Sequence, residues 1–141
     1  NSPLDVTGFF DGIQHRVAGN ITTLDKLEKQ TLFGLKKDAR FHFVVVCAAK
    51  GCPRIENFAY RPEKLEAQLT RQTKQALNNT DFIRVNDKKK NVGLSKIFEW
   101  YKKDFENNSS VLNFVNKYRN VPIPSKYKVE FYEYNWNLNK Q

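Results

Sequence analysis

The sequence predicts an α+β fold: a single domain over residues 1–141, with a small mixed sheet centred on residues 41–47 and about four helices packed against it. Three observations lead to this prediction. The stretch Phe41–Ala48 is apolar on both alternating faces, which is typical of a strand covered on both sides. Several other segments place apolar residues at helical spacing, and helices and strands mix without strict βαβ alternation. A chain of 141 residues also suits one hydrophobic core.

The first regular element is expected after an irregular N-terminal stretch. Residues 2–16 show no periodicity, and their glycines and adjacent phenylalanines indicate a packed loop or short turns. Thr22 or Thr23 can then cap a helix, because its hydroxyl oxygen accepts a backbone N–H of the first turn. Acidic residues early in this segment suit the positive end of a helix dipole. We therefore expect a helix that ends near Gly34.

The segment Phe41–Cys47 is predicted to be the central strand of the sheet. Its residues are mostly aromatic or β-branched, and no polar residue marks a solvent-facing side after His42. A strand of this kind is covered by helices on both faces. We therefore expect both Val44 and Val45 to be buried, one on each face.

The rest of the chain is predicted to contain three helices and two strands. Apolar residues at helical spacing mark the helices, and short alternating segments mark the strands. In chain order these are a helix from Pro62 to about Leu77, a strand at 81–85 followed by a lysine-rich turn at 86–91, a helix capped by Ser95 and reaching Phe105, a helix capped by Ser109 or Ser110 and broken by Pro122 and Pro124, and a strand at 129–134.

The charge and hydropathy of the chain exclude some classes of function. Its 24 basic and 15 acidic residues leave a net charge of +9, but most of the basic residues are lysines and the arginines are scattered. Arginine, with its planar fork, is the better residue for reading phosphates and bases, so we expect no specific nucleic-acid binding. The longest apolar run is far shorter than a membrane span, so we expect no transmembrane segment.

Three motifs carry a resemblance to a known family. They are the run Arg40–Phe43 leading into Cys47–Pro53, then Leu94–Phe105, and then Tyr134–Asn139. Shorter upstream matches extend the agreement to nearly the whole chain. With these motifs in this order, the chain resembles the domain-of-unknown-function 547 family.

The resemblance implies an exported protein without an agreed activity. Members of this family are often found in bacterial cell-envelope or secreted proteins and in plant proteins, so we expect a periplasmic, cell-envelope or secreted location. The chain departs from the family in two places. Asn135 stands where the family usually has Asp, and the Trp-x-Asn-x-Tyr-Asn helix that usually precedes the domain is absent. We therefore expect a domain shortened at its N-terminus, whose apolar face near Phe9 and Phe10 is covered by a second copy or a separate N-terminal fragment, or causes self-association.

The two cysteines, Cys47 and Cys52, are the most reactive side chains in the sequence. Nearby cations such as Lys50 and Arg54 would favour the nucleophilic thiolate if they lie close in space. With only two cysteines and no well-placed histidine pair, the chain cannot build a four-ligand zinc site at these spacings, so we predict no metal or cofactor. In an oxidising compartment the two cysteines would instead form a disulfide, with Cα atoms closer than roughly 7 Å.

Two histidines are candidates for a general base. His42 would share a strand face with Val44 and Val46, whereas Cys47 would face the other way, so a direct pair would need a bulge. His42 could still serve Cys52 if the loop folds back, or it could be a core histidine with satisfied hydrogen bonds. His15, in a glycine-containing stretch, is the alternative base or a solvent-exposed loop residue.

Two functions therefore remain open from the sequence. The first is a thiol-dependent enzyme with Cys47 or Cys52 as nucleophile and His42 or His15 as base, in a papain- or transglutaminase-like layout suggested by the order of elements. The second is a non-catalytic binding module with structural cysteines, in which the aromatic residues of the two later motifs line a groove or form core. A histidine within hydrogen-bond reach of a sulfur would favour the enzyme. The substrate or protein partner is unknown from the sequence.

Overall fold

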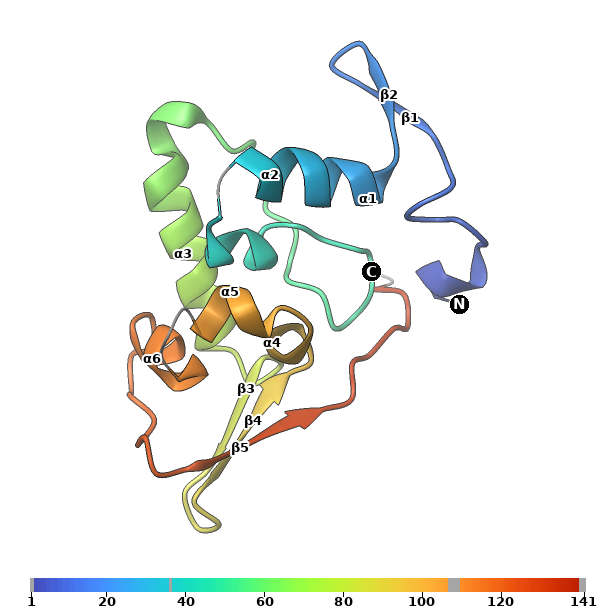
Figure 1. Ribbon diagram of the computed structural model, residues 1–141. Helices are drawn as coiled ribbons and strands as arrows, with labels where there is room; N and C mark the ends of the chain where they lie inside the picture. The colour runs from blue at the N-terminus through green and yellow to red at the C-terminus, as the bar shows by residue number, and fades with distance from the viewer. Residues whose placement is uncertain (1, 36, 107–109, 140–141) are drawn as a thin grey trace.

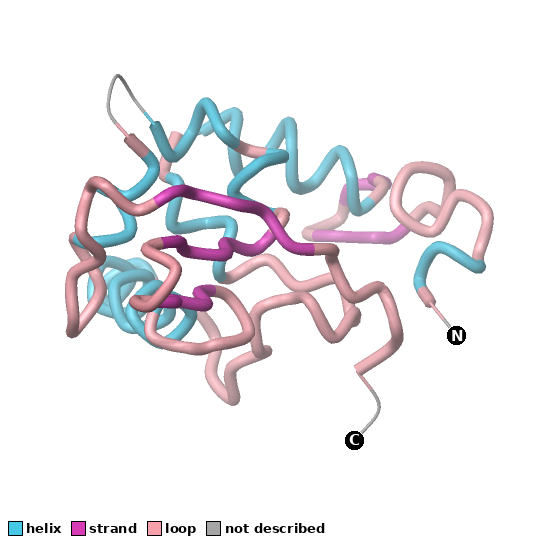
Figure 2. The backbone as a smooth tube through the Cα atoms, turned by 90° about the horizontal axis from the view of Figure 1, so that it is seen from below, coloured by secondary structure: helices cyan, strands magenta, loops and turns pink. Residues whose placement is uncertain are grey.

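A two-stranded hairpin, a three-stranded sheet and a set of short helices make up the fold, which confirms the predicted α+β class (Figure 1). The computed structural model describes residues 2–35, 37–106 and 110–139. Figure 2 shows the three strands of the larger sheet side by side, with the hairpin apart from them on the N-terminal side of the molecule.

The N-terminal stretch holds a short turn, which was one of the two predicted alternatives, and then a hairpin that the sequence did not predict. A 3₁₀ turn spans Pro3–Asp5, and strands β1 (His15–Val17) and β2 (Asn20–Thr22) pair antiparallel. Ala18 and Gly19 join them with φ values of 49° and 83°. A two-residue turn with both φ values positive matches the twist of a hairpin, and glycine adopts that conformation without strain.

The helical segment predicted to end near Gly34 is confirmed and runs from residue 24 to 35. It consists of α1 (Leu24–Lys26), a π-helical stretch at Leu27–Leu32 and α2 (Phe33–Leu35), drawn as one continuous coil in Figure 1. Of the two proposed caps, Thr23 is the one used. Its Oγ1 accepts the Lys26 N–H at 3.3 Å, which satisfies one of the free donors of the first turn.

The predicted central strand at residues 41–47 is wrong. Residues Ala39–Phe43 form a 3₁₀ helix, in which Asp38 caps the first turn by accepting the Arg40 N–H at 3.0 Å. The following valines run on as a turn and an extended loop without a strand partner, and Val46 is 36% exposed. The segment is apolar because it packs among helices and the aromatic core, which gives the same sequence pattern as a strand covered on both faces.

The helix predicted from Pro62 to Leu77 is confirmed. A 3₁₀ turn at Pro62–Lys64 leads directly into α3 (Leu65–Leu77). Proline suits this position because it has no N–H to leave unsatisfied in the first turn. Leu69, Ala76 and Leu77 are buried along the inner face of α3.

The larger sheet is centred on residues 91–95 instead of 41–47. Strand β4 (Asn91–Ser95) lies in the middle, with β3 (Ile83–Asn86) antiparallel on one side and β5 (Lys128–Tyr132) parallel on the other, so the sheet is mixed as predicted. The turn predicted between residues 86 and 91 joins β3 to β4. The strands predicted at residues 81–85 and 129–134 are both present, as β3 and β5. Strand β4 was not predicted, because its first residue fell in the predicted turn and its last at the start of the next predicted helix.

Three short helices connect β4 to β5. They are α4 (Ile97–Trp100), α5 (Lys102–Glu106) and α6 (Val111–Asn116). The single helix predicted from Ser95 to Phe105 is thus interrupted at Tyr101. Ser95 is the last residue of β4, and its Oγ accepts the Ile97 N–H at 3.4 Å. Ser110 caps α6 by accepting the Leu112 N–H at 3.3 Å, whereas Ser109 lies outside the described residues.

The core lies between the larger sheet, α3 and the three connecting helices. Phe43 is fully buried at its centre, with its ring 5.8 Å from that of Phe105 and 5.9 Å from that of Phe98. The 3₁₀ helix that replaces the predicted strand therefore supplies a central core residue. Within the described part of the chain, the structure has no helix with the length and apolar character needed to cross a bilayer.

Candidate functional site

The C-terminal tail pairs with the loop that holds the cysteines, and this pairing builds one wall of the site. Residues 135–139 run alongside residues 48–51, which joins the first and the last sequence motif. The backbone contacts are the N–H of Gly51 to the carbonyl of Asn135 at 2.9 Å, Lys50 to Asn137 at 2.8 Å, Asn139 to Ala48 at 2.8 Å, and a β-bridge between Ala49 and Leu138.

Cys47 and Cys52 form a disulfide, with Cα atoms 6.1 Å apart, within the limit of roughly 7 Å that such a bond requires. Both cysteines of the chain are used, and no free thiol is left. The Tyr134 hydroxyl lies 3.2 Å from Cys52 Sγ and 3.3 Å from Cys47 Sγ. Burial raises the pKa of Tyr134 to about 12, so the phenol is neutral and can donate to sulfur.

Tyr134 belongs to a cluster of three aromatic residues beside the disulfide. Its ring centroid lies 4.9 Å from Trp100 and 4.7 Å from Trp136, and the two indoles are 5.7 Å apart. Trp100 comes from α4 and the other two rings from the C-terminal tail. Trp100 is 46% exposed, so the cluster presents an aromatic surface to solvent.

His42 is held on a carboxylate and between two aromatic rings. Its Nε2 lies 2.9 Å from Asp104 Oδ2, and because an ionised carboxylate only accepts, Nε2 carries the proton. The imidazole stacks between Tyr101, 3.9 Å away by centroid, and Phe33, 4.5 Å away. Burial lowers the pKa of His42 and outweighs Asp104, which acts in the opposite direction. The imidazole is therefore neutral at pH 7.

Tyr101 links this arrangement to the N-terminal helical segment. Its hydroxyl donates to Glu28 Oε1 at 3.1 Å. Burial, followed by the negative charge of Glu28, raises the pKa of Tyr101 well above its usual range, so this phenol also stays protonated. The stack and the two hydrogen bonds fix the orientation of the His42 ring.

The disulfide, His42, Tyr101 and the aromatic cluster line one pocket of about 400 Å³, within the size range of small-molecule sites. Its wall combines the helical segment from 24 to 32, the loop from 45 to 53, the start of α4 and the C-terminal tail. Most of the lining is apolar or aromatic. The aromatic and apolar members are Phe10, Leu24, Leu27, Leu32, Val45, Val46, Pro53, Ile97, Trp100, Tyr101, Tyr134 and Trp136, and the charged ones are Asp25, Glu28 and Lys29.

The three residues predicted as catalytic, Cys47, Cys52 and His42, all line this apolar pocket. Among the described residues, however, no hydrogen bond joins His42 to either sulfur, because Nε2 is bound to Asp104 and the sulfurs contact Tyr134. The argument from strand alternation does not apply, since residues 39–43 are helical.

The alternative base, His15, lies in strand β1 of the hairpin and is not among the residues of the pocket. Within the described ranges, no group of three or more histidine, cysteine or acidic side chains is arranged to hold a metal ion.

Sequence reasoning missed two members of the site. Asp104 was assigned no role from the sequence, although its partner is a histidine 62 residues earlier. Tyr134 was considered as a groove or core aromatic, although its hydroxyl contacts a disulfide 82 residues away. The available signal was that His42, both cysteines, Asp104 and Tyr134 all lie in the three motifs of the resemblance, which the structure brings together.

Comparison with known proteins gives a match to one family model, described as a protein of unknown function, DUF547, over residues 2–77. This match includes Cys47, Cys52 and His42, whereas Asp104 and Tyr134 lie beyond it. No curated protein and no solved structure matches the chain.

Proposed function

Since the chain belongs to the DUF547 family, whose description assigns no activity, we propose from the site itself that it is a non-catalytic binding module. In this proposal the domain works in the periplasm, at the cell envelope or outside the cell, and the Cys47–Cys52 disulfide is structural. The observation that carries the proposal is that both cysteines of the chain are joined, which leaves no thiol to act as a nucleophile.

The disulfide supports a binding role because of what it holds in place. The hydroxyl of Tyr134 bonds to both sulfurs, and the tail that carries Tyr134 pairs with the loop between the cysteines. Closing that loop covalently restricts the unfolded chain and fixes the wall of the apolar pocket. Because the wall is already ordered, less conformational entropy of the protein is lost when a ligand binds.

The lining of the apolar pocket indicates the chemistry of its ligand. The aromatic cluster of Trp100, Tyr134 and Trp136 offers flat apolar surface, and His42 is buried and neutral. Such a surface binds apolar or aromatic groups through burial of area and ring contacts. The ligand that fits best is an apolar, partly aromatic small molecule or side chain.

Anilinonaphthalenesulfonate, whose fluorescence rises in apolar surroundings, is a suitable probe for this pocket. We expect saturable binding of one probe per chain. Trp100→Ala should weaken binding at least several-fold, because it removes an exposed wall of the pocket. The matched control is Val121→Ala, which removes a side chain that is 69% exposed and not part of the pocket. Equal weakening by both variants, or no saturation, would contradict the proposal.

The disulfide is tested separately by counting thiols. In protein secreted by its expression host, we expect no free thiol before reduction and two afterwards, because the chain has two cysteines. Two free thiols in the native secreted protein would exclude the structural role, whatever the outcome of the probe experiment.

One observation favours a second candidate, a thiol enzyme activated by reduction. His42 and both cysteines line the same pocket, and Asp104, which lies outside the lining, holds His42 Nε2 at 2.9 Å. These are the groups that a cysteine nucleophile and its oriented base require. A dithiol reductant would supply two electrons and two protons, breaking the S–S bond to two thiols and becoming a disulfide itself. A cysteine freed in this way would need His42 to take its proton.

The pH dependence of alkylation distinguishes this candidate. After reduction, an activated cysteine reacts with iodoacetamide at a rate that follows a pKa well below the ~8.5 of an ordinary thiol, and His42→Gln abolishes that advantage. Ordinary rates in the reduced wild type, unchanged in His42→Gln, would leave the binding module as the only function supported.

A further inference from the structure

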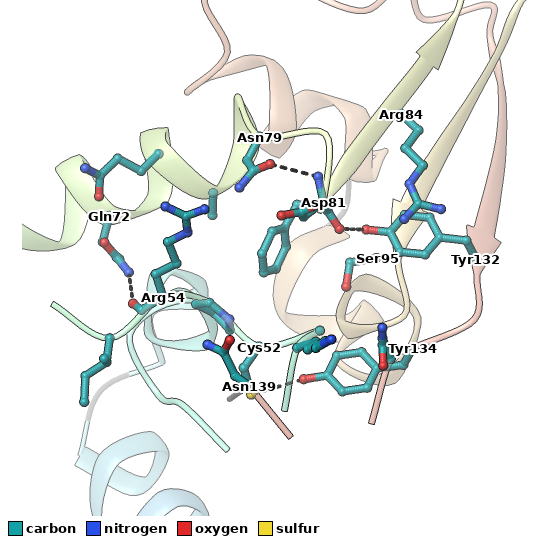
Figure 3. Close-up of a pocket in the computed structure, with 18 of the residues that line it drawn as sticks. Cys52, Arg54, Gln72, Asn79, Asp81, Arg84, Ser95, Tyr132, Tyr134 and Asn139 are labelled. Carbon is teal, nitrogen blue, oxygen red and sulfur yellow. Dashed lines mark hydrogen bonds between the residues drawn. The ribbon is translucent and has the colours of Figure 1, made fainter. Parts of the chain in front are cut away.

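A second pocket, polar where the first is apolar, lies against the same loop and tail. It has a volume of about 740 Å³ and is formed by the loop from 50 to 56, the end of α3, the start of β3 and residues 132–139. Cys52, Pro53 and Tyr134 line both pockets, so the disulfide and the tyrosine form part of the wall between them. Figure 3 shows Cys52 and Tyr134 on the side of the polar pocket. Nothing in the proposed function uses this second pocket.

The polar pocket contains a buried acceptor without a partner. Gln72 on α3 is only 3% exposed, and its Nε2 donates to the Arg54 carbonyl at 2.8 Å. Its Oε1 is buried and has no hydrogen-bond partner among the described residues. Because an unsatisfied buried amide oxygen is costly, a ligand that offers an N–H at this point gains a strong advantage.

Charges of both signs surround this acceptor. Figure 3 places Arg54 beside Gln72 on one side of the pocket, Arg84 with Tyr132 on the other, and Asp81 between them. Within the described chain, the Arg54 guanidinium has no carboxylate partner, whereas Arg84 lies over the Tyr132 ring, 3.9 Å from its centroid. Arg54 is therefore a cation available to bind a carboxylate. Lys50 also lines the pocket, but only a planar guanidinium can form two parallel N–H···O bonds to a carboxylate.

We propose that this polar pocket binds a short peptide that ends in a free carboxylate. The carboxylate pairs with Arg54, a backbone N–H of the peptide donates to Gln72 Oε1, and Asp81 attracts the N-terminal ammonium. The proposal goes beyond the binding function assigned to the apolar pocket and does not depend on it.

The chemistry of the lining favours a peptide over other polar ligands. A phosphate would be repelled by Asp81 and has no donor for Gln72 Oε1 when it is fully ionised. A neutral sugar can donate to Gln72 but makes no use of the opposite charges of Arg54 and Asp81. A zwitterion with an amide N–H in its middle uses all three groups, and a volume of about 740 Å³ falls in the range that encloses a small ligand.

The test is an NMR titration of the ¹⁵N-labelled chain with trialanine, using the C-terminal amide of trialanine and free acetate as comparison ligands. We expect saturable shifts of the Gln72 side-chain amide and of the Arg54 Nε–H. Binding should be at least tenfold weaker for the trialanine amide, since it loses a charge-assisted pair. Acetate should bind more weakly still, because it has no N–H for Gln72.

Matched variants identify the residues responsible. Arg54→Gln should weaken trialanine binding at least tenfold, and Gln72→Leu should weaken it several-fold. The control is Arg61→Gln, which changes an arginine whose side chain is 66% exposed and which does not line the pocket. Arg54 is exposed, so Arg54→Gln should fold normally and remains informative even if Gln72→Leu does not fold.

Four results would overturn the proposal: no saturable shift, equal affinity for trialanine and its amide, equal affinity for trialanine and acetate, or equal binding by Arg54→Gln and the wild type. Shifts confined to the Trp100 indole would overturn it as well, since they would place the peptide in the apolar pocket. None of these results would alter the binding of anilinonaphthalenesulfonate, so failure here is distinguishable from failure of the proposed function.

Discussion

Gly51 is the position where one added methyl group should most disturb the wall between the two pockets. A Cβ built on Gly51 would lie 2.9 Å from Cε2 and Cζ of Tyr134 and 3.0 Å from Cδ2, well inside van der Waals contact. The ring cannot move away easily, because its hydroxyl bonds to the disulfide and the ring packs against Trp100 and Trp136. The backbone cannot move easily either, since the Gly51 N–H donates to the tail at 2.9 Å.

Overpacking of this kind costs about 1 to 3 kcal/mol. For a chain of 141 residues, an unfolding entropy of ~2.1 cal/mol/K per residue converts that cost into a fall in Tm of about 3 to 10 °C for Gly51→Ala. The control is Gly93→Ala in β4, where the added Cβ would meet Tyr132 at 3.5 Å, an ordinary contact, and should be neutral or slightly stabilising. Thermal unfolding followed by circular dichroism measures both. A Gly51→Ala variant as stable as Gly93→Ala would refute the reasoning.

Three further predictions follow from the same structure. Reduction of the Cys47–Cys52 disulfide, which closes a loop with a sequence separation of 5, should lower the free energy of unfolding by about 2 kcal/mol, and a double Cys→Ser variant should show no change in urea unfolding on adding reductant. Because burial lowers the pKa of His42, the unfolded chain binds the proton more readily than the folded chain, so the free energy of unfolding should fall as the pH drops below 6.5. In His42→Gln, the midpoint of urea unfolding should not show this fall with pH. Phe43→Ala should cost about 3 to 5 kcal/mol because the ring is fully buried, whereas Val46→Ala, 36% exposed, should cost less than ~1 kcal/mol; equal losses by calorimetry would restore the predicted strand.

The parts of the fold that the sequence predicted well are those with local signals. The helix from Pro62 to Leu77, the capped helix after Thr23 and the lysine-rich turn after β3 each depend on residues within one or two turns of each other. Their caps, spacings and turn residues act locally, so they are visible without knowledge of the tertiary structure.

The errors arise where tertiary packing decides between elements with the same pattern. An apolar run of seven residues suits either a covered strand or a buried helical turn, and at residues 41–47 the capping by Asp38 and the packing around Phe43 favoured the turn. The opposite error occurred at β4, where Gly93 and Ser95 interrupt the strand pattern. There, pairing with a strand on each side outweighs the weak local preference.

For the site, the residues singled out from the sequence lie together in the structure, but their long-range contacts were not predicted. It singled out Cys47, Cys52 and His42, which share a pocket, and it anticipated a short Cα distance between the cysteines. It did not pair His42 with Asp104 or the sulfurs with Tyr134, because these contacts span 62 and more than 80 residues. No local periodicity records contacts of that range.

The pairing of the tail with the loop at residues 48–51 has a consequence for the order in which the chain folds. The cysteines are close in sequence, so their cross-link can form early, whereas Tyr134 and Cys47 are separated by 87 residues and can meet only after the intervening chain is in place. The entropy lost in closing so long a loop makes such contacts late and slow. We expect refolding experiments to show the two indoles, Trp100 and Trp136, reaching their native fluorescence after the backbone has become helical, and an oxidised loop to shorten that delay.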